Sequence, residues 1–184
     1  MKVTPLSIPD VLLIEPLIFE DSRGFFFESF REDIFKKETS LNVSFVQDNH
    51  SKSSQGALRG LHYQLPQHAQ AKLMRVIQGE VLDIAVDIRE SSPTCGQYVA
   101  EILSSDNKKQ LYIPKGFAHG FLTLSDTSEY LYKTTDFYHP KSERCIIWND
   151  TTLNIVWPKD LNIHLSPKDL LGQSFKSIEL FPCK

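Results

Sequence analysis

The sequence predicts a mainly β protein, a sandwich or barrel of short strands with short peripheral helices. Two observations carry this prediction. Several short stretches alternate apolar and polar side chains, which is the period of a strand with one buried face. Proline and glycine also interrupt the chain at short intervals, with no linker, low-complexity segment or internal repeat between them. Because 184 residues, 41% of them apolar, can bury one sizeable core, we expect a single domain over residues 1–184.

The strongest strand pattern covers residues 81–89. Its apolar side chains fall on one face, and Asp83, Asp87 and Arg89 fall on the other. Residues 78–80, with a central glycine, are expected to form a hairpin turn to a partner strand at residues 72–77. Further strands are expected at residues 97–103, 110–113, 121–124 and 129–135. Only residues 31–38 and the segment after Pro167 are expected to be helical, the latter with Ser166 as a possible N-cap.

Polar residues on the expected strands have two possible surroundings. One face of each strand in a small barrel points to solvent and the other to the interior, where a jelly roll can hold a ligand. The alternation alone leaves both faces open for His62, Lys72, Asp83, Tyr130 and Tyr132.

Composition and charge exclude some classes of function. A formal net charge of −3 argues against a surface adapted as a whole to nucleic acid, although a local basic pocket remains possible. The sequence contains neither a signal-peptide pattern nor an apolar run of membrane-spanning length, so no membrane partner is expected. Cys95, Cys145 and Cys183 lie far apart and form no CxxC pair, so the sequence indicates no disulfide framework. We therefore expect the protein in a reducing cytoplasm.

Two histidines could carry chemistry. His62 lies beside Arg59, Tyr63 and Gln64, and a histidine with a pKa near ~6.5 suits general base work, although a neutral histidine also serves as a purely structural residue. His119 is followed by a glycine, which allows either close approach of a ligand or a tight turn. No HxH or HExxH pattern occurs, so we predict no metal site.

Aromatic and basic residues leave similar alternatives. Tyr130, Tyr132 and Tyr138 are either strand aromatics, or a proton donor and a surface on which a nucleobase stacks. The basic residues Arg23, Arg59, Lys72 and Lys168 are dispersed, so only the fold could bring them together on a diphosphate.

Taken together, the motifs resemble those of the dTDP-4-dehydrorhamnose 3,5-epimerases, a family with a cupin-like jelly-roll fold. The resemblance spans nearly the whole chain and runs in order through DSRGFFFESF (21–30), FVQDNHSKSS (45–54), LRGLHYQLP (58–66), AKLMRVIQGEVLDIAVDIR (71–89), IPKGFAHGF (113–121), YLYKTTDFY (130–138), WND (148–150) and SPKD (166–169). It implies that the protein removes the protons beside the C4 ketone of dTDP-4-dehydro-6-deoxy-D-glucose and returns them from the opposite face, at C3 and C5. No cofactor is implied, because the ketone already acidifies both C–H bonds.

The resemblance also implies roles for individual residues. His62 matches the general base, Tyr132 the acid, Asp169 the carboxylate that orients the histidine, and Lys72 a cation near the enolate oxygen. Tyr138 matches the platform for thymine. The remaining residues implied to bind the substrate are Arg23, Phe26, Glu28, Gln47, Asp48, Asn49, Arg59, His119, Glu143 and Lys168.

The resemblance also bears on how the protein assembles, and the sequence departs from the family pattern at one position. The family forms homodimers in which an N-terminal segment enters the neighbouring site, so Arg23, Phe26 and Glu28 are expected to act in trans. Cys145 stands where glycine is usual in the family. We interpret it as a tolerated small apolar substitution; if a glycine with positive φ were needed there, the contact of Glu143 would shift. Three alternatives to the double epimerase stay open. They are an enzyme that epimerises only C3 or only C5, a ketoisomerase, and a noncatalytic protein that binds a sugar nucleotide.

Overall fold

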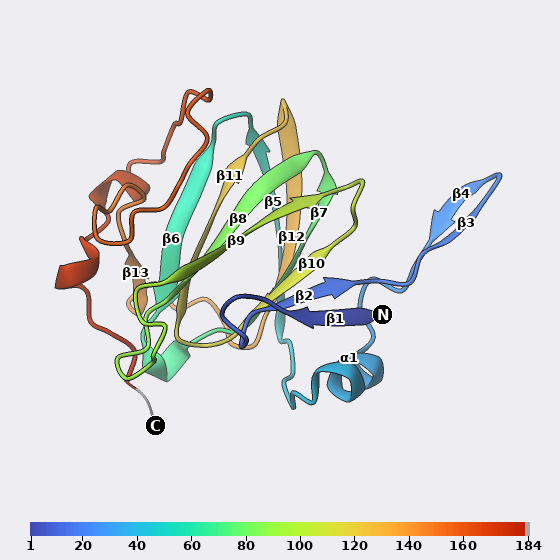
Figure 1. Ribbon diagram of the computed structural model, residues 1–184, viewed down its shortest axis with the longest axis horizontal. Coiled ribbons are helices and arrows are strands. Elements are labelled where there is room, and N and C mark those ends of the chain that lie inside the picture. Colours follow the sequence, from blue (N-terminus) through green and yellow to red (C-terminus); the bar gives the residue numbers. More distant parts are fainter. Residues whose placement is uncertain (183–184) are drawn as a thin grey trace.

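Two antiparallel sheets face each other in the computed structural model, which describes residues 1–182; Cys183 lies outside the described residues (Figure 1). The six-stranded sheet has the order β1 (Lys2–Pro5), β2 (Leu12–Glu15), β10 (Gln110–Ile113), β7 (Lys72–Gln78), β12 (Thr127–Thr134) and β5 (Gln47–Ser54). The five-stranded sheet has the order β13 (Glu143–Cys145), β6 (Leu58–Gln64), β11 (Phe117–Thr123), β8 (Glu80–Asp87) and β9 (Tyr98–Ser104). The predicted mainly β sandwich with a jelly-roll, cupin-like character is confirmed.

The remaining elements are short and peripheral. The strands β3 (Phe19–Asp21) and β4 (Gly24–Phe26) form a hairpin that projects away from the two sheets (Figure 1). The one α-helix among the described residues, α1, covers Glu32–Thr39. Three short 3₁₀ turns complete the set: η1 (Pro66–His68), η2 (Asp169–Leu171) and η3 (Phe175–Ser177). No helix in the described part of the chain is long and apolar enough to cross a membrane.

Apolar side chains fill three layers. Between the sheets, Met74 and Val76 of β7 pack with Val81 and Ala85 of β8. On the outer face of the five-stranded sheet, the C-terminal segment covers Ile84 and other side chains of that face, partly through Trp157. On the outer face of the six-stranded sheet, Phe35 of α1 and neighbouring aromatic rings cover one end. Both faces of the central strands are therefore buried.

The predicted hairpin at residues 78–80 is wrong. β7 and β8 lie in different sheets, and the glycine between them, Gly79, has a φ of +75° at the corner where the chain crosses over. Each of these two strands is already paired on both sides, β7 with β10 and β12, and β8 with β11 and β9. Neither strand therefore has an open edge with which to pair the other.

The predicted helix after Pro167 is reduced to a single turn. Residues Asp169–Leu171 form only η2, and the Ser166 hydroxyl accepts a hydrogen bond from the Asp169 backbone N–H at 3.2 Å. The helix predicted at residues 31–38 is confirmed as α1. The strands predicted between residues 72 and 135 are also present. The strand predicted at residues 121–124 begins earlier, at Phe117, so His119 lies on a strand.

Candidate active site

A cavity of about 670 Å³ opens between the two sheets. It is lined by β5 and β6, by the inward side chains of β7, β11 and β12, and by the segment that leads into η2. The described residues of its wall are Ser51, Lys52, Ser53, Ser54, Ala57, Leu58, Arg59, His62, Lys72, His119, Phe121, Tyr130, Tyr132, Tyr138, Glu143, His164, Leu165, Ser166, Lys168 and Asp169. Of the two surroundings that the sequence left open, solvent and interior, the structure shows the interior for His62, Lys72, Tyr130 and Tyr132.

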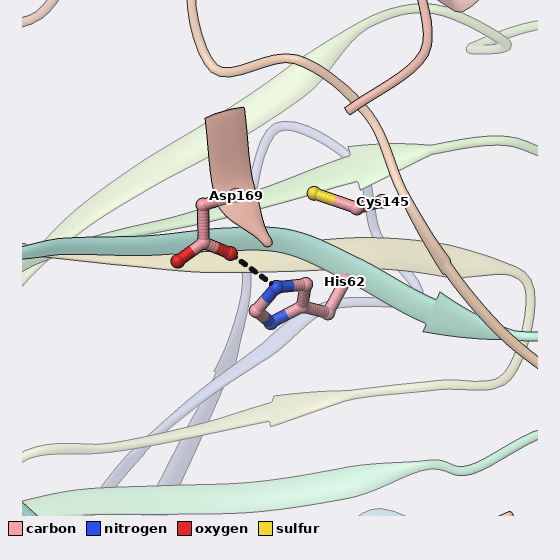
Figure 2. A group of neighbouring side chains, drawn as sticks. All are labelled: His62, Cys145 and Asp169. Carbon is pink, nitrogen blue, oxygen red and sulfur yellow. Dashed lines mark hydrogen bonds and ion pairs between the residues drawn. The ribbon is translucent and has the colours of Figure 1, made fainter. Parts of the chain in front are cut away.

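A histidine and a buried carboxylate face each other on one wall. His62 Nε2 lies 2.6 Å from Asp169 Oδ1 (Figure 2), and the Ser166 hydroxyl donates to the other carboxylate oxygen at 2.7 Å. Burial by itself raises the pKa of Asp169, but the hydrogen bonds from His62 and Ser166 outweigh it and hold that pKa below its usual value. A carboxylate that is charged at neutral pH in this position fixes the imidazole orientation and stabilises its protonated form.

The facing sheet contributes a cation and a phenol. Lys72 projects from β7, where burial lowers the pKa of its ammonium to about 8 against the opposing charges of Asp83 and Glu143. Tyr132 projects from β12; burial raises its pKa, and Arg59 only partly offsets that effect. At neutral pH the site therefore holds a protonated ammonium and a protonated phenol opposite the imidazole.

A hydrogen-bonded network lies beneath the cavity. Asp83, fully buried on β8, accepts a hydrogen bond from the Tyr130 hydroxyl, and its Oδ1 lies 3.0 Å from His119 Nε2. Burial lowers the pKa of His119, although Asp83 opposes the shift. Burial and Asp83 together raise the pKa of Tyr130 well above its usual value. His119 and Tyr130 are thus bound to one carboxylate, which fixes their rings at the cavity wall.

A second cluster borders the cavity at its opening. Glu143 accepts hydrogen bonds from the Tyr138 hydroxyl at 2.6 Å and from the Lys168 ammonium, and this ammonium lies 5.9 Å from the centre of the Tyr138 ring. Burial by itself raises the pKa of Glu143, but the hydrogen bonds from Lys168 and Tyr138 outweigh burial and hold that pKa below its usual value. The Tyr138 residue is 51% exposed, so an aromatic face remains accessible beside two charged groups.

The sequence of this chain matches one family over most of its length. The family model described as dTDP-4-dehydrorhamnose 3,5-epimerase matches residues 5–177. The chain belongs to this family. It is therefore an epimerase, and the resemblance drawn from the ordered sequence motifs is confirmed.

Individual members of the family are similar over their whole length. The dTDP-4-dehydrorhamnose 3,5-epimerase of Pseudomonas aeruginosa is 57% identical over 182 residues, which cover 99% of this chain and 100% of that protein. The crystal structure of the Legionella pneumophila dTDP-6-deoxy-D-glucose-3,5-epimerase, in complex with dTDP-4-keto-L-rhamnose, has a TM-score of 0.95 and 47% identity, covering 100% of this chain and 98% of the other. A 3'-monoepimerase from Streptomyces bikiniensis, in complex with dTDP-quinovose, has a TM-score of 0.90 and 33% identity, covering 97% and 91%.

Some of the substrate-binding residues suggested by the family resemblance do not line this cavity. Gln47, Asp48 and Asn49 start β5; Gln47 donates to Asn49 and accepts from the Tyr138 backbone N–H, and Asp48 forms an ion pair with Lys133. Asp48 and Asn49 instead line a smaller pocket of about 250 Å³, which also includes Tyr132. Three more residues, Arg23, Phe26 and Glu28, lie on or next to the projecting hairpin.

Two residues of this candidate site were not identified as site residues from the sequence. Ser51 lines the cavity, and its buried hydroxyl has no hydrogen-bond partner in the described part of the chain. Ser166 was noted only as an N-cap, but it holds Asp169. The polar alternation of β5 was the available signal for Ser51, since a strand with polar side chains on both faces indicates a wet interior.

The structure also places Cys145 directly opposite His62. The two residues pair across β13 and β6, and the ligand atoms of His62, Cys145 and Asp169 all lie within 4.8 Å of one another (Figure 2). Burial, Asp169 and Glu143 raise the pKa of the Cys145 thiol to about 12. The sequence analysis predicted no metal site, and these three residues are too far apart in the sequence to form a recognisable metal-binding motif.

Proposed function

We propose that this epimerase converts dTDP-4-dehydro-6-deoxy-D-glucose to dTDP-4-dehydro-L-rhamnose by inverting C3 and C5. The observation that carries the proposal is the arrangement of the cavity. The His62–Asp169 pair lies on the side of the five-stranded sheet, and Tyr132 and Lys72 project from the six-stranded sheet into the same space. A base and an acid on opposite walls are what an inversion of a stereocentre requires.

The chemistry follows from these positions. The His62 imidazole removes the proton from the carbon beside the ketone, and the electron pair of that C–H bond moves into an enolate. The Lys72 ammonium stabilises the negative enolate oxygen, an effect that is stronger in a cavity with little water. The Tyr132 phenol then donates a proton to the opposite face of the carbon, and its phenolate regains a proton from solvent while His62 loses one. Asp169 stabilises the imidazolium that forms in between.

We propose that the nucleotide occupies the opening of the cavity. Thymine stacks on the accessible Tyr138 ring, and Arg59 and Lys168 supply positive charge to the diphosphate. The neighbour from Legionella pneumophila supports a ligand of this class, because it was crystallised with dTDP-4-keto-L-rhamnose. The other proposed nucleotide contacts are Gln47, Asp48, Asn49, His119 and Glu143.

The experiment that tests the reaction uses heavy water. Incubation of the enzyme with the 4-keto sugar nucleotide in D₂O, followed by trapping with a reductase and NMR, is expected to place deuterium at both C3 and C5. His62→Ala is expected to lose deuterium incorporation at both carbons while binding dTDP. Tyr132→Phe is expected to exchange the protons at C3 and C5 without inverting these two carbons. Folded wild-type protein that exchanges neither carbon would reject the epimerase proposal.

A mono-epimerase is the second candidate, because the 3'-monoepimerase from Streptomyces bikiniensis has the same fold with a TM-score of 0.90. Small differences in how the sugar meets Tyr132 decide between one inversion and two. The same NMR experiment separates the candidates, since a mono-epimerase inverts only one carbon in the trapped product.

We also propose that two copies of the chain form a homodimer in which the β3–β4 hairpin completes the neighbouring site. The hairpin projects away from the sheets of its own chain (Figure 1), and its Phe25 and Phe26 are 58% and 66% exposed. Among the described residues, the Arg23 side chain binds Asp21 alone. Arg23, Phe26 and Glu28 do not line the cavity of their own chain, which supports a role in trans for them. A cytoplasmic location is a further proposal, supported by a cysteine pattern that suggests no disulfide framework.

A further inference from the structure

Three donors of the kinds that bind zinc converge beside the cavity, where His62 and Asp169 line its wall and Cys145 lies next to them. His62 offers an imidazole nitrogen, Cys145 a sulfur and Asp169 a carboxylate oxygen, all within 4.8 Å of one another (Figure 2). These are three different donor types from three separate segments, with Asp169 only 3% exposed.

The backbone holds these segments against one another. Cys145 and His62 are paired residues in the antiparallel ladder of β13 and β6, so their side chains share one face. On the other side of β13, the Gln173 N–H donates to the Cys145 carbonyl at 2.9 Å, which fixes the chain just after η2. The Ser166 hydroxyl holds the Asp169 carboxylate. The donors are therefore positioned by the fold, not by flexible loops.

We propose that His62, Cys145 and Asp169 form a zinc site that inhibits the enzyme when it is occupied. Zinc in proteins takes nitrogen, thiolate and carboxylate ligands in a tetrahedral arrangement, with water in the fourth position. A thiolate and a carboxylate together carry two negative charges, which balance the charge of Zn²⁺. Binding replaces the thiol proton, which leaves to solvent.

The donor distances require only a local adjustment. Tetrahedral ligands at zinc lie about 3.3 to 3.6 Å apart, as follows from metal–ligand bonds of about 2.0 to 2.3 Å. His62 Nε2 and Asp169 Oδ1 lie 2.6 Å apart and must separate slightly, and the sulfur must approach from within 4.8 Å. The Cys145 thiol makes a long 3.5 Å contact with the Ile146 carbonyl and a backbone contact at Leu61, so its rotation gives up weak sulfur hydrogen bonds. Mg²⁺ and Ca²⁺ prefer sets of oxygen ligands and are not expected to bind.

Occupation of this site removes the base from the reaction. The nitrogen of His62 that bonds Asp169 becomes a metal ligand, and the carboxylate can no longer stabilise an imidazolium. This inhibitory effect rests on the proposed function of His62, whereas metal binding itself does not. A chain with alanine or serine at position 145 keeps the His62–Asp169 pair and loses the third donor.

Cobalt binding tests the site without any use of activity. We expect Co²⁺ to give a thiolate-to-cobalt charge-transfer band in the near ultraviolet with wild-type protein and with the control Cys95→Ala, and none with Cys145→Ala. In calorimetric titration with Zn²⁺, the affinity of Cys145→Ala is expected to be weaker by at least about tenfold. Cys145→Ser, which changes one atom, repeats the comparison if the alanine variant unfolds. A wild type without the band, or variants with unchanged zinc affinity, would overturn the site.

Turnover tests the consequence. Zinc is expected to inhibit the wild-type enzyme reversibly, with full recovery after addition of EDTA, and Cys145→Ala is expected to keep its basal turnover and to need at least about tenfold more zinc for the same inhibition. Wild-type protein that shows the cobalt band but keeps full turnover with zinc bound would support the metal site and overturn the role of His62 as the base. Equal inhibition of both proteins would overturn the inhibitory site.

Discussion

At the scale of single residues, the hydrogen bond between His62 and Asp169 determines what the imidazole can do. The carboxylate is almost fully buried, yet its pKa stays below the usual value because His62 and Ser166 bind its charged form. A negative charge held in this way stabilises the imidazolium in a surrounding where solvent stabilises it little. The neutral amide of asparagine has the same shape without that charge.

Asp169→Asn is therefore expected to lower kcat by about 10²- to 10⁴-fold, because the imidazole loses both its orientation and its counter-charge. Binding of dTDP, measured by calorimetry, is expected to stay near the wild-type value. Asp160→Asn removes an exposed carboxylate and is the matched control. A kcat for Asp169→Asn within a factor of about two of the wild-type value would exclude the orienting role.

Lys72 is expected to support activity at a cost in stability. Burial lowers its pKa to about 8 from an unfolded value of about 10.4, so between these pH values the unfolded chain binds the proton more readily than the folded chain. The resulting destabilisation is full below pH 8 and is lost as the pH rises past 10. In the proposed mechanism this ammonium stabilises the enolate, and that role accounts for a lysine in so buried a position.

Lys72→Met is accordingly expected to raise Tm at pH 7 by about 2–4 °C while turnover is lost. The difference in Tm from the wild type is expected to shrink as the pH rises from 8 to 10. Differential scanning calorimetry across this range gives the measurement, and Lys115→Met, at an exposed lysine, is expected to change neither quantity. A Lys72→Met protein with lower Tm at every pH would contradict the assignment.

At the scale of elements, the close approach of β6 to β11 positions His62. Gly60 has a φ of +133°, and a Cβ at this position would lie 2.5 Å from the Cα of Gly120 on β11. The register between the two strands shifts beside this point, after the pair formed by His62 and His119. The two histidines therefore project together into the cavity because a glycine allows both the backbone angle and the contact.

Gly60→Ala is expected to lower the free energy of unfolding by about 2–4 kcal/mol, because it combines an unfavourable φ with a clash against backbone. Urea denaturation measures the loss as a lower midpoint. Gly96→Ala is the control: its φ is +80°, but the new Cβ meets only the ring of Phe175 at 3.2 Å, so a loss of about 1 kcal/mol is expected. Equal losses in the two variants would mean that the contact with Gly120 is unimportant.

At the scale of the whole molecule, the proposed exchange of hairpins between two chains can be tested by complementation. Arg23→Ala and His62→Ala are each expected to be inactive or strongly impaired alone. In a mixed dimer, one site carries both substitutions and the other carries neither. Mixing equal amounts and allowing the chains to exchange is expected to restore about a quarter of the wild-type sites.

Initial rates before and after mixing provide the measurement, and a tag on one variant shows that the chains have exchanged. Exchange without recovery of activity would place Arg23 in the site of its own chain, or outside any site. A single species with the mass of one chain in analytical ultracentrifugation would reject the dimer itself.

The sequence by itself determined the fold class, the family and several central strands. Residues 81–89 alternate in a way that only a strand explains, and the match to the family rests on side chains whose order along the chain is visible without a structure. The polar strand β5 escaped detection because its inward side chains line a cavity, so the apolar period that reveals a strand is missing.

Only the tertiary structure decided which of these residues meet. His62 and Asp169 are separated by 107 positions, and Cys145 joins them through the pairing of β13 with β6. The assignment of β7 and β8 to different sheets likewise depended on which edges other strands already occupied. Local propensity fixes a strand or a turn, whereas pairing and burial depend on contacts between distant segments, and no pattern within a short window contains them.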